Sequence, residues 1–291
     1  IDRRLLVPTS TGTRFAHALL REVLQDDLLV GERAEYHAAL ASLLDAEVAR
    51  VGSNRAGALA LLAHHRAGAG DMAGALQAWS SAATAAEAIF AFAEAHHHLS
   101  RIIANWNRET STRALVGSDY AEVVARAAEN AFMAGSADDA SRLAREAIEL
   151  VDAVDDPHRS GVLHERLARY IRDTADVDQA LRLVRRAVDL VPSEPPSTDR
   201  ARVLAGLAGQ LMTDGQYLEA RRLATEAVEM ARACGSVLAE SDSLNTLGVL
   251  ATMIDDVELG ITLIRSAREL AEQSGDPHQQ MRSYWNAVSC L

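Results

Sequence analysis

The sequence predicts an all-α solenoid built from two-helix repeats, and three observations lead to this prediction. Small residues recur at a spacing of 40, the prolines fall mostly between periodic segments, and the 48% hydrophobic content includes only 4% aromatic residues. Small apolar side chains at high density suit closely packed helices. Similarity of the chain to itself at a fixed period indicates a repeat array.

Three columns of small residues define the repeat. They are Ala140, Ala180, Ala220 and Gly260, then Ala147, Ala187, Ala227 and Ala267 on the same helices, and Ala128, Ala168, Ala208 and Gly248 on the preceding helices. We expect each column to mark a crossing where helix axes approach to ~8–10 Å. Glycine costs roughly 1 kcal/mol of helix propensity, so a close crossing is the expected reason for Gly248 and Gly260.

Turn and cap residues separate the predicted helices. Gly135-Ser136, Asp176, Gly215 and Asp255 stand where the second helix of each pair should begin, and prolines lie at 157, 192–196 and 277. Small residues at the crossings of paired helices are typical of tetratricopeptide-like repeats, here with a period of about 40 instead of ~34. The expected array is a right-handed superhelix.

The regular repeat begins late in the chain. An earlier pair opens at Gly70-Asp71, but its small residues Ala75 and Ala95 are only 20 residues apart, and residues 105–119 form a polar linker. We interpret this linker as a hinge or domain junction. The predicted domains are therefore residues 1–50, residues 51–110 with irregular first helical repeats, and residues 111–291 with regular repeats.

Composition excludes several functions. The 29 basic and 41 acidic residues give a net charge of −12, which disfavours direct contact with nucleic acid. No apolar run is long enough for a membrane span, and two isolated cysteines favour a reducing compartment, so we expect a cytoplasmic protein. The chain begins at Ile1, which we interpret as a fragment of a longer protein.

Residues 14–44 follow a helical periodicity, with Phe15, Leu19 and Val23 on one side and a break near Gly31. They could form a helix pair that caps the solenoid. They also contain residues that resemble the end of the ATPase module in bacterial regulators of the LuxR/maltose-regulator type, namely Phe15, His17, Ala18, Leu19, Arg21, Glu22, Asp27, Leu28, Leu29, Glu32, Arg33 and His37.

This resemblance implies a STAND-class nucleotide switch, a winged helix, a tetratricopeptide-like sensor and a C-terminal helix-turn-helix in the parent protein. Residues 1–50 would then be the C-terminal part of the winged-helix segment, a short helical remnant before the sensor. It also implies that His17, within Ala16-His17-Ala18-Leu19, senses the phosphate of bound ATP or ADP, although Ala16 departs from the family pattern. No GxxxxGK[ST] loop is present, so we expect no cofactor in this fragment.

The first helix of each pair should line the concave groove of the superhelix. Counting from the small columns, the candidate groove residues are Glu165, Arg169, Arg172, Arg202, Met212, Asn245, Met253, Arg282 and Trp285. Each could instead form inter-repeat salt bridges or core contacts. Consecutive histidines, His64-His65 and His96 to His98, point ~100° apart on a helix, so we predict no metal site.

No catalytic motif is present, and we expect no enzyme activity. The first hypothesis is an effector-sensing, protein-interaction region of a STAND-type LuxR-family transcriptional regulator. Its partners would be its own ATPase module, a small-molecule effector or regulatory protein in the groove, and possibly a second copy. The second hypothesis is a general interaction scaffold without a small-molecule ligand.

Overall fold

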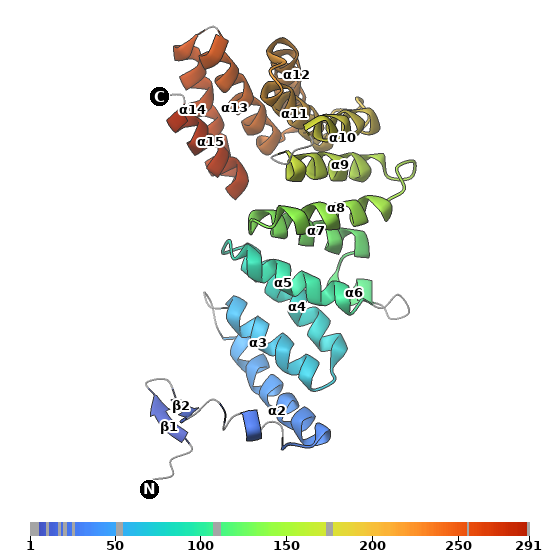
Figure 1. The fold of residues 1–291 in the computed structure, drawn as a ribbon, viewed down its shortest axis with the longest axis vertical. Coiled ribbons are helices and arrows are strands. Elements are labelled where there is room, and N and C mark those ends of the chain that lie inside the picture. The colour runs from blue at the N-terminus through green and yellow to red at the C-terminus, as the bar shows by residue number, and fades with distance from the viewer. Residues whose placement is uncertain are drawn as a thin grey trace.

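The computed structural model describes residues 6–9, 12–16, 19, 22–24, 27–50, 55–106, 112–172, 177–254 and 256–289. After a two-stranded hairpin, β1 (Leu6–Thr9) and β2 (Gly12–Phe15), the described chain is helical throughout (Figure 1). The helices are α2 (Val30–Val48), α3 (Arg55–Gly68), α4 (Met72–Glu87), α5 (Phe92–Ala104), α6 (Thr112–Val116), α7 (Tyr120–Met133), α8 (Ala137–Glu149), α9 (Pro157–Ile171), α10 (Val177–Leu190), α11 (Thr198–Thr213), α12 (Tyr217–Cys234), α13 (Val237–Ile254), α14 (Val257–Ser274) and α15 (Pro277–Ser289).

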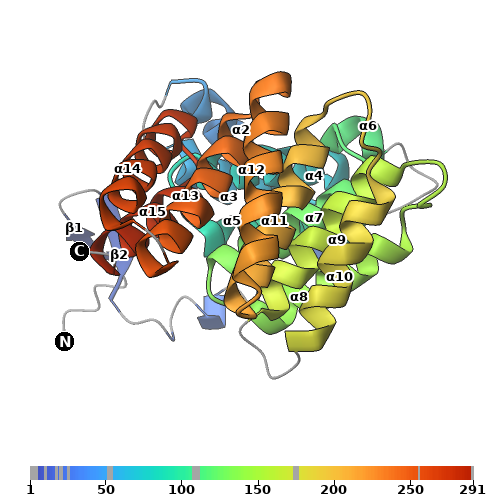
Figure 2. The same ribbon diagram turned by 90° about the horizontal axis from the view of Figure 1, so that it is seen from above.

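Antiparallel helix pairs stack along the long axis of the molecule, from α2 near one end to α15 at the other (Figure 1). Seen from above, α9 to α15 turn about this axis (Figure 2). The turn brings the ring of Phe132 on α7 to within 6.1 Å of the ring of His278 on α15. The prediction of an α-solenoid of tetratricopeptide-like repeats is therefore confirmed.

All twelve residues of the three small columns are buried. The closest approach is between α13 and α14, where Gly248 faces Gly260. A Cβ atom on Gly260 would lie 2.8 Å from both the carbonyl oxygen of Gly248 and the backbone nitrogen of Thr252. These are backbone atoms that cannot move without shifting a helix, so the close crossing accounts for both glycines.

Aspartate and serine side chains cap several helices. Asp71, Asp119, Asp156 and Ser197 accept hydrogen bonds from backbone N–H groups in the first turns of α4, α7, α9 and α11. At α14 the cap is Asp256, one residue after the predicted Asp255, which lies outside the described residues. Asp176 lies outside them too.

The hydrophobic core does not stop at the polar linker. One cluster of buried residues runs from Ala41 to Ala180 and includes Ile102 and Val123 on the two sides of the linker, and Val116 of α6 within it. The ring of Trp106, near the start of the linker, lies 5.1 Å from the ring of Tyr120, just after its end. The linker thus changes the repeat period without interrupting the core, while the domain limits at 50 and 110 stay predictions.

The N-terminal segment differs from its predicted secondary structure. The sequence predicts helix from residue 14, but Phe15 ends β2, which pairs antiparallel with β1 in the register Leu6 to Phe15. β-Branched residues alternate along this stretch, and a two-residue connection joins Thr9 to Gly12, which favours a hairpin over a helix. The main helix of the segment begins only at Val30.

Ion pairs link successive repeats. Arg159 on α9 donates to both carboxylate oxygens of Asp119, the N-cap of α7, at 2.6 and 2.7 Å. This hydrogen bonding lowers the pKa of Asp119 to about 2. Within the described ranges, no helix combines the length and apolar character needed to cross a membrane.

Candidate functional site: a charged pocket in the groove

A cavity of about 430 Å³ lies on the inner side of the repeats, between α9, α11, α13 and α15. These helices are seen side by side in Figure 2. Charged side chains dominate its lining: Arg166, Arg169, Arg172, Arg202, Arg282, Glu129, Glu165, Asp199, Asp242 and Asp276. Since α9, α11, α13 and α15 belong to different repeats, the pocket depends on how those repeats are placed relative to one another.

Glu129 on α7 neutralises one side of the pocket. Arg169 donates to both its carboxylate oxygens at 2.7 and 2.9 Å, and the Tyr170 hydroxyl donates to it at 2.8 Å. Burial alone would raise the pKa of Glu129, but Arg169 and Arg166 outweigh burial and hold that pKa well below its usual range. The Glu129 side chain is therefore a carboxylate at neutral pH, matched to Arg169.

Two further ion pairs cross the pocket between neighbouring repeats. The Nε of Arg202 on α11 donates to Glu165 on α9 at 2.7 Å, and Glu165 is only 6% exposed. Arg282 on α15 donates to Asp242 on α13 and, at 3.0 Å, to the hydroxyl of Thr246. Burial opposes ionisation of both carboxyls, but the neighbouring arginines lower the pKa of each.

Arg172 is the exception among the five pocket arginines. Its guanidinium forms no hydrogen bond or ion pair with any residue that the structure describes, and its Nε is shielded from solvent. Burial and the like charge of Arg282 lower the pKa of Arg172, although the nearby carboxylates of Asp242 and Glu165 oppose this effect. The pocket therefore holds a guanidinium that has a shielded Nε and no hydrogen-bond acceptor among the described residues.

His278, at the start of α15, lies at the junction of the pocket with α7. Burial lowers its pKa to about 4, and the neighbouring Arg169 adds to this effect. The imidazole is consequently neutral near pH 7 and contributes a hydrogen-bonding group without a charge.

The structure brings five of the nine predicted groove residues into this pocket: Glu165, Arg169, Arg172, Arg202 and Arg282. The other four lie elsewhere. Asn245 is fully buried and accepts a hydrogen bond from Asn286 at 2.8 Å, and Met212 packs on the core of α11 and α12. Met253 and Trp285 are 57% and 73% exposed.

Sequence reasoning missed Glu129, Asp242 and His278, and the repeat itself contained a signal for two of them. Glu129 precedes Arg169 by 40 residues, and Asp242 lies midway between Arg202 and Arg282 at the same spacing. Counting 40 residues back from Arg169 and 40 residues forward from Arg202 would have identified both acidic residues. The predicted nucleotide-sensing residue, His17, lies outside the described residues.

No protein-family model matches the sequence, and no curated protein matches it. Solved structures do resemble the fold. The apo form of the quorum sensor NprR from B. thuringiensis is 11% identical with a TM-score of 0.55, over 92% of this chain and 74% of that one.

Two further structures have lower TM-scores. A STAND protein with a tetratricopeptide repeat sensor from Pyrococcus horikoshii is 15% identical with a TM-score of 0.49, over 98% of this chain and 41% of that one. Kinesin light chain TPR-like repeats from Podosopora anserina are 17% identical with a TM-score of 0.48, over 69% of this chain and 96% of that one. Together with the buried small columns, the NprR match identifies the chain as a tetratricopeptide-like repeat solenoid.

Proposed function

We propose that the chain is the effector-sensing and protein-interaction arm of a STAND-type transcriptional regulator of the LuxR/maltose-regulator kind, and that the charged pocket binds a small anionic effector. The observation that carries the proposal is Arg172, whose Nε is shielded and whose guanidinium has no acceptor among the described residues. A carboxylate or phosphate group would supply that acceptor in the geometry that arginine favours.

The size and chemistry of the pocket support a small molecule. A cavity of about 430 Å³ falls within the range of ~300–1,000 Å³ that is usual for small-ligand sites. Glu129, Glu165 and Asp242 already pair with Arg169, Arg202 and Arg282, so they hold the site together in the free protein. The lining holds five arginines and five acidic residues, and Arg172 is the arginine among them that has no ion-pair partner within the described residues.

Binding in this pocket would act on the shape of the superhelix. A ligand held by Arg172 and by residues of α11, α13 or α15 would fix the spacing of several repeats at once. The ligand can favour one curvature only by binding it more tightly than the alternatives. We infer that this curvature is what the ATPase module of the parent protein senses.

The N-terminal segment is the proposed joint to that ATPase module. Apolar side chains along it are exposed, including Leu19 at 72%, Val23 at 57% and Leu29 at 71%. Exposed apolar side chains in a group are typical of an interaction surface. In this proposal His17 reads the phosphate of ATP or ADP bound to the ATPase module, following the sequence resemblance.

Calorimetric titration of the 291-residue chain tests the effector proposal. The titrants are inorganic phosphate, sugar phosphates and di- and tricarboxylates, with neutral sugars as the chemical control. We expect saturable binding of at least one class of anion, weakened about tenfold or more in Arg172→Gln, since a charge-assisted hydrogen bond contributes ~1.5–3 kcal/mol. Arg222→Gln, on the 64% exposed side chain of Arg222 in α12, is the matched control and should bind like the wild type.

Binding of no anion by the wild type would remove the effector proposal and leave the general interaction scaffold. Equal weakening in Arg172→Gln and Arg222→Gln would show that overall charge, and not the pocket, governs affinity. Saturable binding of an acidic protein segment alone would assign the pocket to a regulatory protein instead of a small molecule.

A further inference from the structure

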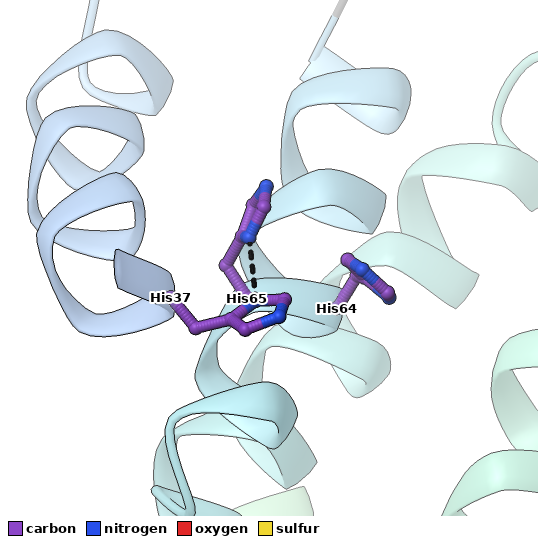
Figure 3. A group of neighbouring side chains, drawn as sticks. All are labelled: His37, His64 and His65. Atoms are coloured by element: carbon purple, nitrogen blue, oxygen red, sulfur yellow. Dashed lines mark hydrogen bonds between the residues drawn. The ribbon is translucent and has the colours of Figure 1, made fainter. Parts of the chain in front are cut away.

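Three imidazole rings meet between α2 and α3 (Figure 3). These two helices lie toward the other end of the array from α13 and α15, which line the charged pocket (Figure 1). His37 comes from α2, and the consecutive residues His64 and His65 come from α3. One ring nitrogen of each lies within 4.8 Å of the others, and the Nδ1 atoms of His37 and His65 are 2.9 Å apart. The three ring centroids are separated by 5.0, 5.1 and 5.5 Å.

Sequence reasoning rejected His64-His65 as a metal site because consecutive helical side chains diverge by ~100°. The structure supplies what that argument lacked, a third histidine on a neighbouring helix. His37 contacts the rings of both His64 and His65, so the two diverging side chains share a neighbour (Figure 3). The prediction that no metal site exists therefore considered too few residues.

We propose that His37, His64 and His65 bind one late first-row divalent metal ion, such as Zn²⁺, which fastens α2 to α3. Imidazole nitrogens bind Zn²⁺ at ~2.0–2.1 Å, which places tetrahedral ligands about 3.3 Å from one another. The 2.9 Å separation of the two Nδ1 atoms needs only a slight opening to reach this value. His64 is exposed, so its ring can turn toward the others with little loss of packing.

The surroundings of the rings favour neutral imidazole, the form that binds metal. Burial lowers the pKa of both His37 and His65, and the neighbouring histidines lower it further. The ring of His37 sits against Gly68, where a Cβ atom would lie 2.6 Å from its Nδ1. The missing side chain at Gly68 thus gives His37 room beside α3.

The ion would add to an existing contact between the two helices. Arg66 on α3 donates to both oxygens of Asp45 on α2 at 2.6 and 2.9 Å. Three histidines leave one position of a tetrahedral ion for water. Arg33, one turn before His37, places a like charge near the ion and lowers its affinity.

Titration of the EDTA-treated 291-residue chain with Zn²⁺, followed by calorimetry, tests the site. We expect one ion per chain, and affinity at least about tenfold weaker in His37→Gln and in His64→Gln, since each loses a ligand. Zn²⁺ should also raise the melting temperature of the wild type but not of these variants. His97→Gln removes an exposed histidine of α5 and is the matched control, with wild-type binding expected.

Absence of saturable Zn²⁺ binding by the wild type would overturn the proposal and leave His37 and His65 as a simple hydrogen-bonded pair. Equal affinity in the wild type and His64→Gln would also overturn it. Equal weakening in His97→Gln and His64→Gln would assign the binding to scattered histidines. If His37→Gln loses helical circular dichroism, His64→Gln decides the question, because its side chain is exposed.

Discussion

Replacing Arg172 and Arg169 separately with methionine should change the stability of the free protein in opposite directions. Arg169 lies in the last turn of α9, Arg172 is the C-cap of that helix, and both line the same pocket. Arg169 is matched by Glu129, whereas Arg172 has no acceptor among the described residues. Methionine keeps an unbranched apolar stem of similar shape, so the comparison isolates the charged group.

The expected magnitudes follow from these environments. Breaking a buried ion pair costs ~3–5 kcal/mol, and because the Glu129 side chain is 28% exposed we expect Arg169→Met to cost about 2–3 kcal/mol. A shielded donor without an acceptor costs ~1–3 kcal/mol, so Arg172→Met should raise the free energy of unfolding by about 1 kcal/mol. The two variants should therefore differ by about 3–4 kcal/mol.

Urea unfolding followed by far-UV circular dichroism measures both free energies of unfolding. The same pair of variants should behave alike in anion binding, because Arg172→Met loses the ligand contact and Arg169→Met disturbs the pocket. Destabilisation by more than 2 kcal/mol in Arg172→Met would refute the reasoning, since it would mean that this guanidinium is already satisfied within the chain.

Four further substitutions probe packing and titration. Gly260→Ala should destabilise the protein by about 2 kcal/mol or more through its backbone clash, whereas Gly209→Ala, whose Cβ would meet nothing closer than 3.9 Å, should stabilise it by about 0.5–1 kcal/mol in thermal or urea unfolding. Asp119→Asn keeps a helix cap but loses the ion pair. We expect a loss of about 1 kcal/mol at pH 7, reduced by solvent because Asp119 is 36% exposed, and this loss should vanish as the pH falls from about 4 to about 2. The lowered pKa of His278 makes the wild type lose up to about 2 kcal/mol as the pH falls from about 6.5 toward 4, and His278→Gln should flatten this dependence of unfolding on pH.

Each of these predictions has an outcome that would contradict it. Equal effects of Gly260→Ala and Gly209→Ala would mean that helix propensity, and not the close crossing, governs both positions. A constant difference between Asp119→Asn and the wild type from pH 7 to pH 2 would show that the carboxylate charge contributes nothing. An unchanged pH dependence in His278→Gln would assign the acid sensitivity to other groups.

The repeat could be predicted from sequence because it depends on side-chain volume at fixed positions. Ala140, Ala180 and Ala220 are 0% exposed, as the column predicts. Each crossing of two helices requires a small residue at one position. Because this requirement recurs once per helix pair, it appears in the sequence as a regular spacing of small residues. The N-terminal hairpin gave a weaker signal, because a short strand pair has no such repetition. The apolar spacing that predicts a helix from residue 14 also includes Phe15, which belongs to β2.

Partners and pockets could be predicted only in part. Counting along the repeat placed Arg169, Arg202 and Arg282 on the inner side, but it could not say that each would meet an acid while Arg172 would not. That difference depends on rotamers and on the angle between repeats. The histidine group was missed because His37 lies outside the columns, and only the packing of α2 on α3 brings it to His65.

Three of the ion pairs between repeats share one property that bears on how such a chain can change its length. The pairs Asp119 with Arg159, Glu129 with Arg169, and Asp242 with Arg282 each span 40 residues, which is the repeat period itself. These three links join equivalent positions of adjacent units, whereas the pair of Glu165 with Arg202 spans 37 residues. Duplication or deletion of one whole unit preserves the spacing of these three links, so the array can gain or lose entire repeats without losing them.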